Sequence, residues 1–257
     1  DHDGHAGRLP QGLIRAALHG EAEHDRQDDD NGNGNGGKQK LVSKIVDDYG
    51  NGETCTITFE YDSEGKMTKV VETYKGGEDD GRVITTKFKK EGTKLVATWD
   101  TNDENGDESC TFECELNDKG LVTKAVGVGS EKYESIDYNE NNQLVSTTGS
   151  KFSCKWLNGN ITSLENYGTT TYTYTEYENK TNYDFNWQLI QVWEYDFVET
   201  SYFGVKSKNL IASVTEGGER YTYEYTFDKD GYVTTIKAYD ESGVKTLDYT
   251  TTVTYKE

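Results

Sequence analysis

The sequence predicts an all-β fold in which one large antiparallel meander rolls into a barrel-like or half-barrel sheet. A hairpin unit recurs along the chain: an aromatic or apolar stretch runs into Asp or Asn, two or three polar residues and usually Gly follow, and a hydrophobic residue, often with Thr, resumes the pattern. The residues between these turns alternate between aromatic and polar types, as half-buried strands do. The copies span residues 59–68, 114–123, 136–145, 225–234 and, in shorter form, 155–162.

Each unit is typical of strand, tight turn and strand. An Asp or Asn side chain hydrogen-bonds to its own backbone and begins the turn, and Gly supplies the positive φ that the turn requires. The only proline is Pro10, so every residue of the predicted body can donate to a β-ladder. The turns therefore depend on Gly, Asn and Asp.

The alternation predicts which side of each strand is buried. In residues 55–61 the apolar and aromatic side chains share one face, and Thr and Glu share the other. The same division holds in 110–114, 152–156, 221–227 and 247–255. The predicted inward residues include Phe59, Cys110, Phe112, Cys114, Phe152, Cys154, Trp156, Tyr221, Tyr223, Tyr225, Leu247, Tyr249, Val253 and Tyr255.

A sheet with one aromatic face must cover that face by rolling up or by stacking on another layer. Roughly a dozen or more strands are expected, a number that usually curls. The opposite face carries Thr, Glu and Lys, whereas a membrane-spanning barrel needs an apolar band outside. The pattern therefore argues against a membrane-spanning protein.

An apolar stretch at about 183–203 interrupts the pattern. Its side chains fit a helical stripe, although some also fit a strand, and Asp184 is placed to cap a helix. We expect a short helical or irregular insert that closes the open side of the rolled sheet. The floor of a ligand pocket is the alternative role.

The chain divides into a tail and linker, residues 1–37, and a single β-domain, residues 38–257. The tail is charged and low in complexity, which predicts disorder, and its short apolar run is too small for a membrane helix or the core of a signal peptide. The formal net charge of −20 repels nucleic acid. We therefore expect no nucleic-acid partner.

Several segments resemble a known family. The hairpin units, the Thr- and Tyr-rich strand 169–177, and the segments 182–189 and 203–210 are similar to exported lipoproteins of Bacteroidota, catalogued as a domain of unknown function with a porin-like fold. The hairpin units alone also resemble YD-repeat shells. The resemblance implies an exported protein at the cell surface or in the periplasm, tethered to the outer membrane through a lipidated Cys ahead of the linker. No Cys precedes Cys55 in this sequence, so the anchor residue is not present in this chain.

The chemistry-bearing residues favour a non-catalytic protein. All four histidines (His2, His5, His19 and His24) lie in the tail, which leaves the body without a His-dependent triad or a His-ligated metal site. Cys55, Cys110, Cys114 and Cys154 lie at inward positions and are expected as core residues, with a cross-strand disulfide as the alternative in an exported protein. The acidic segment 100–108 lacks the Gly and Glu positions of an EF-hand and is expected as a hairpin turn. We expect no metal and no cofactor.

Two functional hypotheses concern the insert. Trp187 and Trp193, with Asp184 and Asn186 nearby, are the candidate ligand-binding residues, because indole rings stack on sugars and their neighbours can hydrogen-bond. The partner would be an extracellular glycan or a peptide. Alternatively, two of the carboxylates Asp184, Glu194, Asp196 and Glu199 form the acid pair of a glycoside hydrolase. A purely structural surface protein is the third reading.

Overall fold

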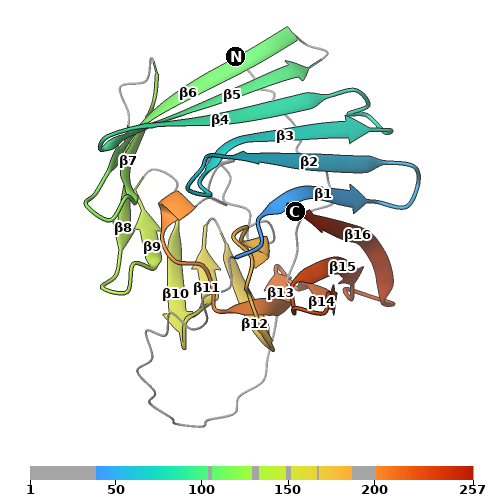
Figure 1. The fold of residues 1–257 in the computed structure, drawn as a ribbon. Helices are drawn as coiled ribbons and strands as arrows, with labels where there is room; N and C mark the ends of the chain where they lie inside the picture. The colour runs from blue at the N-terminus through green and yellow to red at the C-terminus, as the bar shows by residue number, and fades with distance from the viewer. Residues whose placement is uncertain are drawn as a thin grey trace, which may run out of the picture.

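The structure is a computed structural model that describes residues 39–103, 106–128, 133–148, 152–166, 168–186 and 201–256. Sixteen antiparallel strands follow one another around a closed barrel, and β1 pairs with β16 to complete it (Figure 1). The prediction of a rolled antiparallel meander is confirmed. Of the two predicted forms, barrel-like and half-barrel, the structure shows the closed barrel. Closure leaves no unpaired sheet edge, which a barrel-sized meander would otherwise expose.

The strands alternate in direction, so their connections gather at two ends of the barrel. Their bounds are β1 Val42–Asp48, β2 Thr54–Tyr61, β3 Met67–Lys75, β4 Val83–Glu91, β5 Lys94–Asp103, β6 Gly106–Leu116, β7 Val122–Gly127, β8 Tyr133–Tyr138, β9 Leu144–Thr147, β10 Ser153–Leu157, β11 Asn160–Glu165, β12 Thr169–Glu178, β13 Asn209–Glu216, β14 Glu219–Phe227, β15 Val233–Asp240 and β16 Thr246–Tyr255. A 3₁₀ turn, η1, spans Ser201–Phe203.

The recurrent hairpin units form turns at one end, which we call the Asx end because Asp or Asn begins each turn. Asp62 is representative: its Oδ1 accepts hydrogen bonds from the amides of Glu64 and Lys66, both at 2.9 Å. Gly65 then takes φ 80°, and in the copy at 136–145 Asn142 occupies the same place with φ 59°. Asn tolerates this left-handed conformation better than most residues, which is why the unit survives there without Gly.

The inner face of the barrel is apolar and the outer face is polar. Along β2, Cys55, Ile57 and Phe59 are buried while Thr58 and Glu60 are exposed. Tyr223, Tyr225 and Phe227 of β14 pack against the same core. The predicted division between aromatic and hydroxyl-bearing faces is therefore confirmed.

One inward prediction is wrong. Leu247 shares the parity of Tyr249, yet its side chain is 55% exposed. The register between β15 and β16 shifts at this point, because Ala238 pairs with Tyr249 and Tyr239 pairs with Leu247. Asp248 is thus an extra residue, a β-bulge that reverses the alternation beyond it.

The wall is uneven. The ladder between β5 and β6 contains ten residue pairs, whereas β9 and β10 share a single pair, Ser146 with Ser153. The long strands β2–β6 form one broad side of the barrel, and the short strands β7–β11 form another (Figure 1). Two further hydrogen bonds cross the seam between β9 and β10, from the Thr147 amide to the Phe152 carbonyl at 3.0 Å and from the Trp156 indole to the Leu144 carbonyl at 2.7 Å.

Candidate functional site

The β12–β13 connection leaves and rejoins the wall at the Asx end, and its described parts are residues 179–186 and 201–208. Tyr183 and Phe185 are fully buried, and the ring of Tyr183 lies 5.0 Å, centroid to centroid, from that of Phe59 on β2. The ring of Tyr202, within η1, lies 6.4 Å, centroid to centroid, from that of Phe88 on β4. Tyr183, Phe185 and Tyr202, in the described parts of the connection, therefore pack against the inner face of the barrel.

Asp184 and Asn186, two of the predicted ligand-binding residues, are buried in this connection. The Asn186 amide group donates to the carbonyl of Asn209 at 2.7 Å and accepts from the amide of Ile211 at 3.0 Å, so it pairs with β13 much as a neighbouring strand would. Asp184 Oδ1 accepts from Asn179 Nδ2 at 2.7 Å and from the Asn186 amide at 3.1 Å. Both side chains thus hold the connection in place.

Two side chains of opposite charge, Asp184 and Lys206, attract one another within the same segment. Lys206 Nζ donates to the carbonyl oxygens of Asn179 and Thr181, which fixes the path of the chain between them. Burial raises the pKa of Asp184 to about 6, although attraction to Lys206 and the hydrogen bonds from Asn179 and Asn186 oppose the shift. Burial likewise lowers the pKa of Lys206, against the attraction of Asp184. The hydrogen bonds and the mutual attraction offset part of the cost of burying these two charges.

Residues 204–209 bridge the weak seam of the wall. The Val205 amide donates to the Asn142 carbonyl in the β8–β9 turn at 3.0 Å. Farther along, the Lys208 amide donates to the Gly159 carbonyl in the β10–β11 turn at 2.9 Å, and the Ile161 amide donates to Ser207 Oγ at 3.2 Å. In Figure 1 this orange segment runs from η1 past β10 and β11 to β13. The connection therefore ties together the two turns that flank the seam.

The remaining predicted insert residues lie outside the described part of the chain. They are Trp187 and Trp193, the candidate stacking rings, and Glu194, Asp196 and Glu199, the carboxylates of the hydrolase hypothesis. The four tail histidines also lie outside it. The glycan-stacking and acid-pair interpretations therefore stay predictions.

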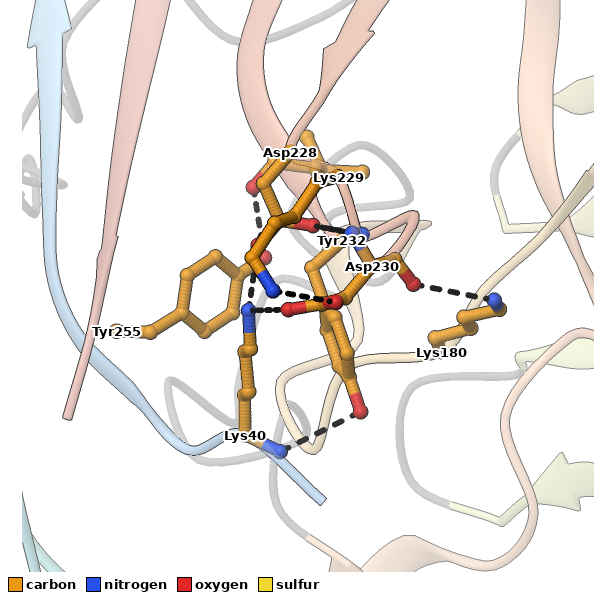
Figure 2. A network of polar contacts seen from close by, with 8 residues as sticks. Lys40, Lys180, Asp228, Lys229, Asp230, Tyr232 and Tyr255 are labelled. Carbon is orange, nitrogen blue, oxygen red and sulfur yellow. Dashed lines mark hydrogen bonds and ion pairs between the residues drawn. The ribbon is translucent and has the colours of Figure 1, made fainter. Parts of the chain in front are cut away.

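A second polar network secures the start of β1 at the Asx end (Figure 2). Lys40 Nζ lies 2.7 Å from Asp228 Oδ2 and 2.7 Å from Asp230 Oδ2, in the β14–β15 turn. Lys180 Nζ donates to the Asp230 carbonyl at 3.4 Å, which connects the β12–β13 connection to the same turn. Sequence inspection missed this cluster, because Lys40 and Asp228 are brought together only when the barrel closes.

At the opposite end, an inward row of residues crosses three strands and continues to Tyr49, just after β1. Tyr249 of β16 pairs with Ala238 of β15, which pairs with Tyr223 of β14, and the Tyr49 ring lies 6.0 Å from that of Tyr249. The next inward row contains Asp47, which accepts a hydrogen bond from Thr251 Oγ1. The sequence predicted the inward tyrosines of β14 and β16 but missed Asp47. The sequence did contain a signal for Asp47, because this carboxylate lies two residues after Ile45 and therefore on the same, inward face of the strand.

Among the described residues there is no reactive cysteine and no cluster of metal ligands. Cys55, Cys114 and Cys154 are buried, Cys110 is half-buried, and all four are free, so the predicted core role holds and the disulfide alternative does not. Burial raises the pKa of the Cys114 thiol to about 12, which keeps it protonated and unreactive. The described residues gather no set of three or more His, Cys, Asp or Glu side chains able to hold a metal ion.

No helix in the described part of the chain is long and apolar enough to cross a membrane.

These features define a closed antiparallel barrel with a polar outer face, in which the described parts of the β12–β13 connection pack Tyr183, Phe185 and Tyr202 against the core. Among solved structures, the chain is similar to a porin-like protein from Bacteroides uniformis, with a TM-score of 0.66 and 19% identity over 85% of this chain and 99% of that one. It also matches a porin-like protein from Bacteroides vulgatus at a TM-score of 0.37 and 11% identity, over 84% of this chain and 99% of that one. No protein-family model and no curated protein matches the sequence. The first likeness supports the porin-like fold that the resemblance implied.

Proposed function

We propose that this chain is a non-catalytic binding module that works outside the cytoplasm, at the cell surface or in the periplasm, with its barrel as a rigid support. The observation that carries the proposal is the distribution of side chains across the wall. The inner face holds the apolar core, and the outer face presents Thr, Glu and Lys to water. A barrel embedded in lipid has the reverse arrangement, with an apolar outer band.

The insert is the proposed binding element, and a glycan or a peptide is its proposed partner. Asp184 and Asn186 anchor its first turn from within, so that Trp187 follows directly from a fixed point of the fold. A ring next to a rigid anchor loses little conformational entropy when it stacks on a ligand. Asp184 and Asn186 would then position the stacking residues, and their side chains would stay engaged with the protein.

A glycan array and a peptide array, probed with the wild-type protein and with Trp187→Ala and Trp193→Ala, test this proposal. We expect a signal that at least one of the two substitutions abolishes, because loss of a stacking ring costs a binder much of its affinity. Leu157→Ala is the matched control, since it truncates an exposed apolar side chain elsewhere on the barrel. A signal that survives both Trp substitutions would overturn the assignment of the insert. Release of sugar from an array glycan would support the acid-pair hydrolase instead.

A further inference from the structure

Three side chains of complementary chemistry meet where the β12–β13 connection leaves and rejoins the wall. They are the amine of Lys206, the carboxamide of Asn179 and the carboxyl group of Asp184. Asn179 directly follows the last residue of β12, and Lys206 lies shortly before the start of β13. Asn179 and Asp184 are buried, and Lys206 is partly buried. An amine, an amide and an acid that a fold holds together away from water can react with one another.

Lys206 supplies the amine. Its Nζ donates to the main-chain oxygens of Asn179 and Thr181, and it forms no other hydrogen bond within the described residues. A charged ammonium group has three N–H donors, whereas a neutral amine has two and a lone pair. The two acceptors therefore match the neutral amine, and burial lowers the pKa of Lys206 in the same direction. A desolvated neutral amine is the form of lysine that attacks a carbonyl carbon.

Asn179 supplies the carbonyl carbon. Its Nδ2 donates to Asp184 Oδ1 at 2.7 Å and to the Ser207 carbonyl at 3.3 Å. Its Oδ1 is buried and has no hydrogen-bond partner in the described part of the chain. Lys206 Nζ already contacts Asn179 through the main-chain oxygen. To attack the side-chain carbon Cγ, the amine has only to move from one carbonyl group of Asn179 to the other.

Asp184 supplies the acid. Its Oδ1 contacts Asn179 Nδ2, which is the atom that leaves when the amide is attacked. Burial raises the pKa of Asp184 to about 6 and lowers that of Lys206, although the attraction of Asp184 and Glu178 for the ammonium group opposes the second shift. The two shifts favour transfer of a proton from the ammonium group to the carboxylate. A carboxylic acid next to a leaving nitrogen is a general acid.

We propose that Lys206 and Asn179 form an isopeptide bond, with Asp184 as the acid–base group. Lys206 Nζ attacks Asn179 Cγ, so that the Nζ–Cγ bond forms and the Cγ–Nδ2 bond breaks. Asp184 accepts the proton that Nζ loses and donates a proton to Nδ2, which leaves as ammonia. Asp184 ends in its starting state, one amide replaces another, and no oxidant or other co-reactant is needed.

The bond would enclose residues 180–205 in a covalent loop and fasten both ends of the insert to the wall. Proteins that work outside the cytoplasm often carry covalent braces, which disulfides usually supply. The four cysteines of this barrel are free, so a brace of this chain has to use other side chains. A closed loop restricts the unfolded chain and thereby stabilises the fold. The bond goes beyond the binding role proposed for the insert, and neither proposal depends on the other.

Mass spectrometry of the intact, denatured wild-type protein tests the proposal. We expect a mass about 17 Da below that of the amino-acid sequence, because one ammonia is lost. Tandem mass spectrometry of a proteolytic digest should show one branched peptide in which Lys206 Nζ is joined to Asn179 Cγ. The variants Lys206→Arg, Asn179→Ala and Asp184→Asn should each show the full mass of their sequence. Lys206→Arg keeps the positive charge of the side chain and removes the reactive amine.

Lys208→Arg is the matched control. Lys208 lies on the same segment, its side chain is exposed, and it contacts Gly159 of the β10–β11 turn. This variant should lose ammonia like the wild type. The proposal is overturned if the wild type shows its full sequence mass, or if Lys206→Arg also loses ammonia, which would assign the loss to an asparagine elsewhere that cyclises to a succinimide. The branched peptide is sought in the wild type, so the result stands even if a variant fails to fold.

Discussion

The hydroxyl of Tyr61, the last residue of β2, donates a hydrogen bond of 2.6 Å to the carbonyl of Val42, the first residue of β1. The same relationship recurs around the Asx end. Tyr138 of β8 donates to Val122 of β7, and Tyr255 of β16 donates to Val233 of β15, both at 2.7 Å. In each case an aromatic residue at the end of one strand satisfies a carbonyl at the start of the strand before it. This bond gives a physical reason for Tyr beside Asp62 and Asn139 in the repeated unit.

Removal of this hydroxyl should destabilise the barrel in proportion to the bonds lost. Tyr138→Phe removes one hydrogen bond and should lower the free energy of unfolding by about 1 kcal/mol. Tyr61→Phe also removes the hydrogen bond that the Tyr61 hydroxyl accepts from Asn182 at 3.0 Å. This variant should lower the free energy of unfolding by about 2 kcal/mol. Urea unfolding followed by tryptophan fluorescence measures both values.

Tyr177→Phe is the control for these substitutions, because the Tyr177 side chain is exposed and its hydroxyl has no partner within the described residues. Its free energy of unfolding should match that of the wild type. Equal stability of Tyr61→Phe and Tyr177→Phe would show that the recurrent bond contributes nothing.

The repeated unit made the hairpins predictable from sequence, because its turn chemistry and its alternation are both local. Asp62 and Gly65 act within a few residues of one another, so their roles could be predicted without the rest of the fold. Closure was not predictable in this way. It depends on the pairing of β1 with β16, whose residues are about two hundred positions apart.

The candidate sites show the same limit. The sequence placed Asp184 and Asn186 near a ligand, but the partners of Asn186 on β13, Asn209 and Ile211, could be found only when the chain returned to the wall. Leu247 was predicted to face inward because strict alternation was assumed along the strand. The bulge adds one residue that this assumption does not include, so the residues beyond it are assigned to the wrong face. Asp47 drew no attention because a single carboxylate in a chain of net charge −20 carries little information.

Gly204 should be intolerant of any side chain. It has φ +97°, and a Cβ built there would collide with the Asn142 carbonyl and press on the Tyr138 ring at 3.1 Å. Gly204→Ala should therefore lower the free energy of unfolding by roughly 3 kcal/mol, as strain and a steric clash combine. Hydrogen exchange should accelerate first at β9 and β10, whose seam residues 204–209 support.

The variant Gly218→Ala separates the effect of backbone strain from that of the steric clash. Gly218 has φ +93° but open space around it, so this substitution introduces the backbone strain without the clash. It should lower the free energy of unfolding by only about 1 kcal/mol and should leave hydrogen exchange at β9 and β10 unchanged. If both variants lose the same stability, the close approach of Gly204 to the β8–β9 turn is not what makes this position intolerant.

The Lys40 network should contribute little to stability, and its contribution should depend on salt. Lys40 and Asp230 are partly exposed, with side-chain exposures of 33% and 40%, and exposed ion pairs contribute little to the free energy of unfolding. Lys40→Met should therefore destabilise the protein slightly at low ionic strength and less at 1 M salt, where the pair is screened. Thermal unfolding at both salt concentrations measures the difference. A large loss that persists in 1 M salt would assign Lys40 a packing role instead.

Asp184 should make the protein less stable as pH rises from about 4 to about 6. Its pKa is raised from 3.8 to about 6, chiefly by burial, so the folded state holds the proton more tightly than the unfolded chain does. The stabilisation is complete below the unfolded pKa and is lost as pH rises through the folded value, by about 3 kcal/mol in total. Urea unfolding of the wild type and of Asp184→Asn at intervals between pH 4 and pH 7 should show the wild type losing stability relative to the variant. Asp240→Asn should give the opposite sign, because hydrogen bonds from Ser242 hold the pKa of Asp240 low. A difference between wild type and Asp184→Asn that stays constant across this range would mean that the pKa of Asp184 is the same in the folded and unfolded chains, and that Lys206 and the hydrogen bonds to Asp184 fully offset its burial.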